Sequence, residues 1–282
     1  MPLLTEPIRE HYSKSQIFLG GLEWLTLSTT EFGHYTYLVI NGKKVLCIIP
    51  ARGGSKGVSR KNLRDLNGRP LLGWPIRAAK QSKYIDEIIC STEDSEIAEL
   101  ARDLGARTPF RRPSELASDE AATADVLLHA LENLEQNNEF FDYILLLEPT
   151  SPLTEVSDID HAIEVLETES VEFDSLVTVC ESISGHPNFT FEFVNSSRLL
   201  KSINQKEWKL YRRQEINPLY FVEGTLYLSK VSTFKTHKLF IQPKTFGMEI
   251  PRWKSFEIDD ELDFLLINAI MRDAADRFPR EN

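Results

Sequence analysis

A glycine-rich basic loop is the stretch of this chain whose residues are best suited to chemistry. It follows the apolar run VLCII at residues 45–49, which predicts a buried strand. Residues 52–69 hold six Lys or Arg against one acid, in a chain whose formal net charge is −11. Glycine lets backbone N–H groups approach an anion closely. A polyphosphate held by loop amides and cationic side chains would account for this local reversal of charge.

Two well-known nucleotide-binding motifs are absent from this loop. The P-loop spacing G-x-x-x-x-G-K-[ST] does not occur, and there is no G-x-G-x-x-G with an acid about 20 residues later. Strand-to-helix turns with several glycines are common in α/β proteins, and basic loops are often only solvated. The loop by itself therefore leaves a phosphate site and a solvated turn both open.

An acidic run near the carboxyl end, FEIDDELDF, is the second candidate for chemistry. If its first residues form a short strand, alternation places Glu257 and Asp259 on one face. Two carboxylates at this spacing suit Mg²⁺, which keeps several waters and binds substrate phosphates. The alternative is an acidic N-terminus for the last helix, where carboxylates complement the helix dipole. We expect only that second role for Asp260 and Glu261.

The composition excludes several classes of protein. The chain has 282 residues, enough for one large domain or two small ones. Its pI near 5.1 argues against nucleic-acid binding. We find no secretory signal and no apolar run near the ~18 residues that cross a bilayer. Cys47, Cys90 and Cys180 lack metal-ligand spacing, which predicts buried reduced thiols. We therefore expect a cytoplasmic enzyme with neither nucleic-acid nor membrane partners.

The elements that must position these residues alternate along the chain. Apolar runs of strand length are separated by segments of helix length, which predicts an α/β fold with a mostly parallel sheet flanked by helices. Residues 1–43 are expected to be an extension of unknown role, and residues 44–282 the main domain, with an inserted arm at about 186–218. The expected helices are 74–83, 95–105 (ended by Gly105), 123–136, 157–169 (opened by Ser157) and 262–278, and the expected strands after the first are 86–92, 143–149, 174–181 and 219–229.

Four motifs in order carry a resemblance to a known family. They are IIPARGGSKGVSRKNLRDLNGRPLL, RPSELASD, LLLEPTSPL and FEIDDELDF. Together they resemble the acylneuraminate cytidylyltransferases, also called CMP-sialic acid synthetases, over residues 44–275. The resemblance implies a nucleotide-diphosphosugar transferase-like fold and attack by a sugar hydroxyl on the α-phosphorus of CTP, with release of pyrophosphate. It also implies Mg²⁺ as cofactor and a homodimer formed through the arm.

The resemblance assigns the nucleotide half of the site. It implies catalytic roles for Arg52, Lys56 and Asp259, and a metal site of Asp259 with Glu257. For Arg112 alone an ordinary surface ion pair would be the simpler explanation, but its place in the ordered motifs favours contact with CTP. The residues expected to bind the nucleotide are Arg52, Gly53, Ser55, Lys56, Asn62, Arg112 and Thr123.

The acceptor half of the site departs from the family pattern. Glu148 stands where the sialic type commonly has Gln, Glu223 where it has Asn, and Phe189 where a lysine would align. Glu257 also replaces an Asp, which makes Asp259 the stronger candidate for the metal. Arg213, on the arm, is the remaining partner for an acceptor carboxylate. Because these changes lower the local charge, we expect an acceptor other than N-acetylneuraminic acid.

These observations predict a Mg²⁺-dependent cytidylyltransferase that activates a nonulosonic (sialic-acid-like) sugar acid. Glu148, Arg213 and Glu223 are the candidate substrate residues. One alternative is a sugar-1-phosphate nucleotidyltransferase of the same fold, in which a phosphate attacks. Another is a non-catalytic nucleotide-binding relative that has kept the fold. Retention of Arg52, Lys56 and Asp259 argues against the last alternative.

Overall fold

The computed structural model describes most of the main domain. The predicted extension at 1–43 lies almost wholly outside the described residues, as do Ser55 and Lys56 of the basic loop. For Arg213 the backbone is described but the side chain is not. The described residues are 42–54, 57–183, 185–194, 199–203, 212–274 and 276–278.

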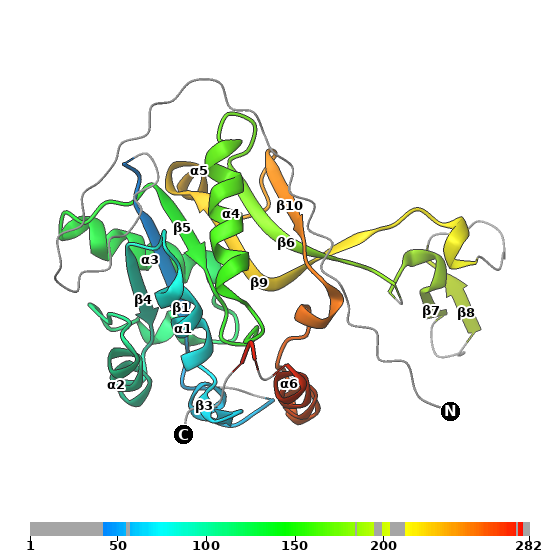
Figure 1. The fold of residues 1–282 in the computed structure, drawn as a ribbon, viewed down its shortest axis with the longest axis horizontal. Coiled ribbons are helices and arrows are strands. Elements are labelled where there is room, and N and C mark those ends of the chain that lie inside the picture. Colours follow the sequence, from blue (N-terminus) through cyan, green and yellow to red (C-terminus); the bar gives the residue numbers. More distant parts are fainter. Residues whose placement is uncertain are drawn as a thin grey trace. The chain divides into compact units, whose positions relative to one another are not determined.

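A six-stranded sheet forms the centre of the domain, in the order β10-β6-β9-β5-β1-β4 (Figure 1). β1 runs parallel to β4 and β5, and β10 runs parallel to β6. β9 is antiparallel to both of its neighbours, β5 and β6. The prediction of a mostly parallel sheet is confirmed. The strands are β1 Val45–Pro50, β4 Glu87–Ser91, β5 Tyr143–Leu146, β6 Ser175–Glu181, β9 Tyr220–Lys230 and β10 Thr245–Glu249.

Helices cover both faces of this sheet because alternate residues of β1 point to opposite sides. Cys47 and Ile49 pack with α1, α2 and α4, whereas Leu46 and Ile48 pack with α3 and α5. Both sides of β1 are fully buried, as a central strand of an α/β fold requires. The helices are α1 Gly73–Gln81, α2 Ser95–Leu104, α3 Thr123–Gln136, α4 Val156–Thr168, α5 Val231–His237 and α6 Glu261–Asp273.

The ends of the helices show which local signals were decisive. Gly105 ends α2 with a φ of 100°, as predicted, since glycine adopts the left-handed region without strain. The prediction that Ser157 opens α4 is wrong: Glu155 is the N-cap and forms a capping box with Asp158. Asp260 caps α6 by accepting hydrogen bonds from the N–H groups of Leu262 and Asp263, which confirms its expected role.

A third apolar cluster joins α6 to the basic loop. Val58 from the loop and Ile258 from the acidic segment are both fully buried in it. The remaining buried members are Leu66, Leu71, Trp74, Leu153, Phe264, Ile267, Met271 and Phe278. The two segments with candidate chemistry are therefore held by one common core.

Two small hairpins complete the described structure. β2 (Asp65–Leu66) pairs with β3 (Arg69–Pro70) just after the basic loop. β7 (Phe191–Val194) pairs with β8 (Leu199–Ser202), and this hairpin falls inside the predicted arm. Short 3-10 turns cover Lys61–Leu63, Ser114–Ala117, Pro187–Phe189, Arg213–Glu215 and Arg252–Lys254.

The three cysteines are buried and unpaired, as predicted. Burial raises the pKa of the Cys47 thiol above its ordinary range and that of Cys90 to about 12. Cys47 and Cys90 are therefore inert packing residues rather than nucleophiles. Among the described helices, none has the length and apolar content that a membrane crossing would require.

Candidate active site

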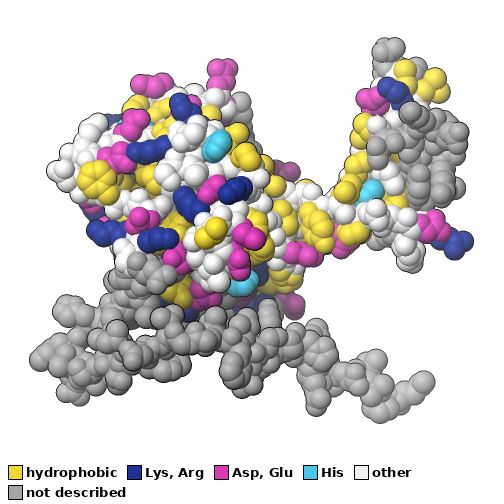
Figure 2. Space-filling model, turned by 90° about the horizontal axis from the view of Figure 1, so that it is seen from above, with side chains coloured by type: hydrophobic (Ala, Val, Ile, Leu, Met, Phe, Trp, Pro, Cys, Tyr) yellow, Lys and Arg dark blue, Asp and Glu magenta, His cyan; other side chains and the backbone are white. Residues whose placement is uncertain are grey.

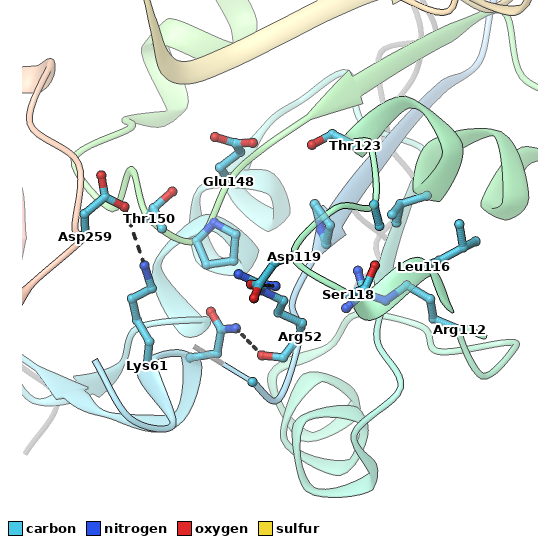
Figure 3. Close-up of a pocket in the computed structure, with 16 residues that line it drawn as sticks. Arg52, Lys61, Arg112, Leu116, Ser118, Asp119, Thr123, Glu148, Thr150 and Asp259 are labelled. Carbon is cyan, nitrogen blue, oxygen red and sulfur yellow. Dashed lines mark hydrogen bonds and ion pairs between the residues drawn. The ribbon is translucent and has the colours of Figure 1, made fainter. Parts of the chain in front are cut away.

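A cavity of about 330 Å³ lies beyond the carboxyl ends of β1 and β5 (Figure 3). Open α/β sheets bind ligands at this edge. Figure 3 shows basic side chains on one side of the cavity and the carboxylates of Glu148 and Asp259 on the other. Its lining residues are Pro50, Arg52, Gly54, Lys61, Asn62, Arg112, Leu116, Ser118, Asp119, Ala121, Thr123, Val126, Glu148, Pro149, Thr150 and Asp259.

The loop after β1 brings Arg52 into this cavity. Asn62 Nδ2 donates a hydrogen bond to the carbonyl oxygen of Arg52 at 3.0 Å, which fixes the backbone at that point. The guanidinium of Arg52 pairs at 2.6 Å with Asp119, which also lines the cavity. Both groups of this ion pair are more than a third exposed, so an incoming polyphosphate can compete for Arg52 at small cost.

Glu93 links the loop to the second predicted nucleotide motif. Its carboxylate accepts from the Gly53 N–H at 2.7 Å and from Arg112 Nη2 at 2.7 Å. Burial by itself would raise the pKa of Glu93, but these hydrogen bonds outweigh burial and hold that pKa below its ordinary value. Arg112 is buried, and its Nε has no hydrogen-bond partner among the described residues. It is an ordered, cavity-lining arginine rather than a surface ion pair.

Lys61 is a site residue that the sequence analysis did not single out. Its Nζ donates to the carbonyl oxygen of Ile258 at 2.7 Å and lies 3.8 Å from Asp259 Oδ1 (Figure 3). The side chain is only 13% exposed, and burial lowers its pKa. The signal in the sequence was its position beside Asn62 within the basic loop. It was counted there only as one of several cations.

The acidic segment does not form the predicted short strand. It is irregular between the turn Arg252–Lys254 and α6, because the Ile258 N–H donates to Thr150 of a loop rather than to a strand. Glu257 Oε1 accepts from the Gly224 N–H at 2.7 Å, whereas Asp259 lines the cavity. A Cβ at Gly57 would stand 1.9 Å from the Asp259 carbonyl oxygen, so only glycine permits this contact between loop and acidic segment.

The geometry at Asp259 fits a magnesium ion that is completed by substrate. The Asp259 side chain is 83% exposed and points into the cavity beside Lys61. One carboxylate oxygen of Glu257 accepts a hydrogen bond from the Gly224 N–H, so its other oxygen would be the one to bind a metal ion. The described residues contain no group of three or more His, Cys, Asp or Glu able to hold a metal ion. Mg²⁺ commonly binds through one or two carboxylates with phosphate oxygens and water, so the exposed carboxylate of Asp259 is compatible with such an ion.

Glu148 occupies the opposite wall of the cavity from Arg52. It follows β5, where the strand leaves the sheet. Burial, together with the nearby carboxylates of Glu257, Asp259 and Glu223, raises the pKa of Glu148 to about 7. Its carboxyl group therefore changes charge near neutral pH.

Glu223 and Phe189 are not among the residues that line the cavity. Glu223 is 3% exposed and accepts hydrogen bonds from the backbone and hydroxyl of Thr225. Burial raises its pKa. Phe189 lies in the turn Pro187–Phe189 beside His186, at the start of the arm. Glu148 is thus the one of these three departures from the family pattern that reaches the cavity wall directly.

A second cavity of about 370 Å³ shares Thr123 and Glu148 with the first. Its walls are mainly apolar and come from α3, β5, β9 and the segment after α5. The lining residues are Ala122, Thr123, Ala124, Leu146, Glu148, Tyr227, Phe234, Lys238, Leu239, Phe240 and Ile241. A ligand bound beside Glu148 in the first, polar cavity can therefore place an apolar substituent in the second cavity.

A protein-family model described as cytidylyltransferase matches residues 46–264, which contain this entire site. The chain belongs to the cytidylyltransferase family. It is 32% identical over 229 residues to a CMP-N,N'-diacetyllegionaminic acid synthase of Legionella pneumophila, covering 81% of this chain and 96% of that protein. It is 31% identical to a pseudaminic acid cytidylyltransferase of Campylobacter jejuni, covering 79% and 95%. The family predicted from the sequence is confirmed.

Solved structures agree with this cytidylyltransferase fold. A CMP:2-keto-3-deoxy-manno-octonic acid synthetase complexed with CTP superposes with a TM-score of 0.60 at 16% identity, covering 82% of this chain and 99% of that one. A 4-diphosphocytidyl-2C-methyl-D-erythritol synthase from Anaerococcus prevotii gives a TM-score of 0.53 at 12% identity, covering 82% and 99%. At these identities the similarity establishes the fold alone.

Proposed function

We propose that this cytidylyltransferase transfers CMP from CTP to the anomeric hydroxyl of a nonulosonic sugar acid and releases pyrophosphate. The observation that carries this proposal is the composition of one cavity. Arg52, Lys61 and Arg112 line it together with Asp259 and Glu148. The similar proteins named above act on legionaminic and pseudaminic acids, which supports a nonulosonic acceptor.

The cationic side chains bind and orient the triphosphate. Arg52 exchanges its ion pair with Asp119 for phosphate oxygens, and Lys61 neutralises charge between the triphosphate and the acidic segment. Asn62 holds the backbone of Arg52 while this happens. Charge grows on the phosphoryl oxygens and the leaving pyrophosphate, so positioned cations lower the barrier.

Asp259 would hold Mg²⁺, with Glu257 offering its second oxygen. When bound, the ion supplies positive charge to the phosphate oxygens that gain negative charge during transfer. Among the described residues the Asp259 side chain makes no hydrogen bond that it would have to give up, since its contact with Lys61 is a 3.8 Å ion pair.

The acceptor enters past Glu148. We assign its N-acyl substituent to the apolar cavity and its ring hydroxyls to the Glu148 carboxylate. Arg213, from the arm, would pair with the acceptor carboxylate. We also propose that the enzyme is a cytoplasmic homodimer joined through this arm. Exposed apolar side chains along the arm and the first residues of β9 support the dimer: Phe191, Phe193, Leu199, Leu200, Ile203, Tyr220, Phe221 and Val222.

The test is release of pyrophosphate in a matrix of four nucleoside triphosphates against several acceptors. We expect release with CTP and a nonulosonic acid, and none with CTP and a sugar 1-phosphate. Release with the sugar 1-phosphate instead would support the sugar-1-phosphate nucleotidyltransferase. Binding of CTP without release under any combination would indicate a non-catalytic relative.

A further inference from the structure

An acidic side chain, Asp119, stands on the side of the cavity that is otherwise suited to bind phosphate. Its carboxylate lines the cavity together with Arg52, Lys61 and Arg112. Figure 3 shows Asp119 beside the guanidinium of Arg52, and the ion pair between them measures 2.6 Å. A carboxylate at this place repels a triphosphate and competes with it for Arg52. Neither binding of the triphosphate nor transfer of CMP calls for an acid here.

The cavity holds a second pair of an arginine with an acid, and the two pairs differ in how firmly they are held. Arg112 pairs with Glu93 at 2.7 Å, and only 3% of the Arg112 side chain is exposed. Glu93 also accepts from the Gly53 N–H, so this pair is fixed to the backbone of the loop. In the pair of Arg52 with Asp119 the side chains are 37% and 41% exposed. Water and salt weaken such an exposed pair, so it can open when phosphate arrives.

The backbone at Arg52 is held in place, whereas Asp119 lies in an exposed turn. The Arg52 carbonyl oxygen accepts from Asn62 Nδ2 at 3.0 Å. In the turn of Asp119, the Ala121 N–H donates to the Ser118 carbonyl oxygen at 3.4 Å, and Asp119 and its two neighbours in the chain are exposed. The guanidinium can therefore exchange Asp119 for phosphate without a change in the backbone of Arg52.

We propose that Asp119 is a positioning residue that competes with phosphate for Arg52 and so makes the enzyme release pyrophosphate readily. The inference rests on the proposed function, in which pyrophosphate is the leaving group. The ion pair of Arg52 with Asp119 stabilises the empty site, because it is broken whenever phosphate occupies the guanidinium. A product held by several cationic side chains is thereby bound less tightly than those side chains alone would bind it.

Two other roles for Asp119 predict the opposite result. An acid that orients Arg52 toward phosphate would strengthen the binding of pyrophosphate. An acid that binds the Mg²⁺ of the nucleotide would strengthen it as well. A competing acid weakens that binding, so the sign of the change on removing the carboxylate decides between the three roles.

The test is calorimetric titration of the free enzyme with inorganic pyrophosphate in the presence of Mg²⁺. Asp119→Asn and Asp119→Ala should each lower the Kd by about fivefold, the upper end for loss of an exposed ion pair. The Ki of pyrophosphate against CTP should fall by the same factor. Glu120→Gln is the matched control, on an exposed neighbour that is not among the residues that line the cavity, and should change the Kd by less than about twofold. A Kd that rises, or that falls by less than about twofold, in either Asp119 variant would overturn the inference.

The same titration in an Arg52→Ala background shows whether the effect passes through Arg52. There Asp119→Asn should change the Kd for pyrophosphate by less than about twofold, because no guanidinium is left to compete for. A gain of about fivefold without Arg52 would mean that Asp119 acts through its charge alone, and would overturn the inference.

The inference and the proposed function fail in distinguishable ways. Release of pyrophosphate from CTP and a sugar acid, together with an unchanged Kd in the Asp119 variants, refutes only the inference. No release with any sugar acid in the panel refutes the proposed function and the inference with it.

Discussion

Lys61 joins the two halves of the catalytic machinery, because its ammonium contacts the acidic segment and faces the cavity. We predict that Lys61→Ala lowers kcat/KM for CTP by about 10²-fold, which corresponds to roughly 2.7 kcal/mol of transition-state stabilisation. Steady-state kinetics on the folded variant provide the measurement. Values near those of the wild type would remove Lys61 from the site. Lys44→Ala, outside the cavity, is the control.

We predict different roles for the adjacent residues Asp259 and Asp260. Asp259→Asn removes a charge from an exposed side chain, so we predict that the fold persists while Mg²⁺-dependent activity collapses. Asp260→Ala should instead lower the free energy of unfolding by about 1 kcal/mol through loss of the α6 cap, with metal dependence intact. Magnesium titrations and urea unfolding of both variants distinguish the roles. If Asp259→Asn unfolds with its metal dependence unchanged, the metal assignment is wrong.

Glu148 gives the free enzyme a characteristic pH dependence. The pKa of this acid is raised in the folded state to about 7, so the folded state binds the proton more tightly than the unfolded state. Its contribution to stability is therefore full below the unfolded pKa of about 4.5 and is lost as the pH rises through 7. We predict that the wild type loses on the order of 3 kcal/mol of its free energy of unfolding across this pH range, and that Glu148→Gln does not show this loss. Urea unfolding from pH 4.5 to 8 measures the difference, and parallel curves would contradict it.

At the scale of elements, Lys254 attaches the turn that precedes the acidic segment to the start of α4. Its buried ammonium lies 2.5 Å from Glu155 Oε2 and 2.6 Å from Asp158 Oδ2. Lys254→Met removes the buried cation that these two carboxylates share and leaves Glu155 only a 3.8 Å ion pair with Arg277, so we predict a loss of about 3 kcal/mol in the free energy of unfolding. Lys83→Met breaks an exposed pair with Glu164 and should cost less than about 1 kcal/mol. Equal losses for the two variants would show that burial of Lys254 does not matter.

The sequence predicted the elements with strong periodicity and missed those without it. The helix predicted over 123–136 coincides with α3, and the apolar run VLCII became β1. β10 and α5 were not predicted, because each is short and β10 contains Gly247. The acidic segment was predicted as a strand from its alternation, but its hydrogen bonds go to loops. Hydrophobic periodicity indicates which side chains are buried. It does not indicate which backbone segments will hydrogen-bond to each other.

The fact that sequence does not show backbone pairing also explains which site residues were predicted correctly. The nucleotide residues Arg52, Asn62 and Arg112 come from contiguous motifs, so a sequence match brings them together. Glu223 was assigned to the acceptor pocket by alignment, whereas its position on β9 turns it toward Thr225 and away from the cavity wall. That outcome depends on strand register, which no single sequence displays.

At the scale of the whole molecule, the arm is the surface that most needs a partner. Figure 2 shows hydrophobic side chains gathered along the hairpin and the strand segments that lead to it. Phe193, for example, is 64% exposed there. We predict that Phe193→Asp converts a dimer into a monomer, measured as molar mass by light scattering. Phe140→Asp, at a comparably exposed residue outside the arm, is the control. A wild-type monomer, or a dimer that survives Phe193→Asp, would refute the arm interface.

The contact between Gly57 and the Asp259 backbone has a consequence for how such enzymes can be recombined. The proposed nucleotide-binding residues before β5 and the proposed acceptor residues after it lie in two successive stretches of chain, which invites chimeras with a crossover in the loop between α3 and β5. Yet the loop at Gly57 and the segment at Asp259 fall on opposite sides of that crossover and fit together without room for a methyl group. A productive graft must therefore inherit both segments from one parent. New acceptor preferences are more readily reached by exchanging residues between Glu148 and Phe240 while leaving residues 257–260 in place.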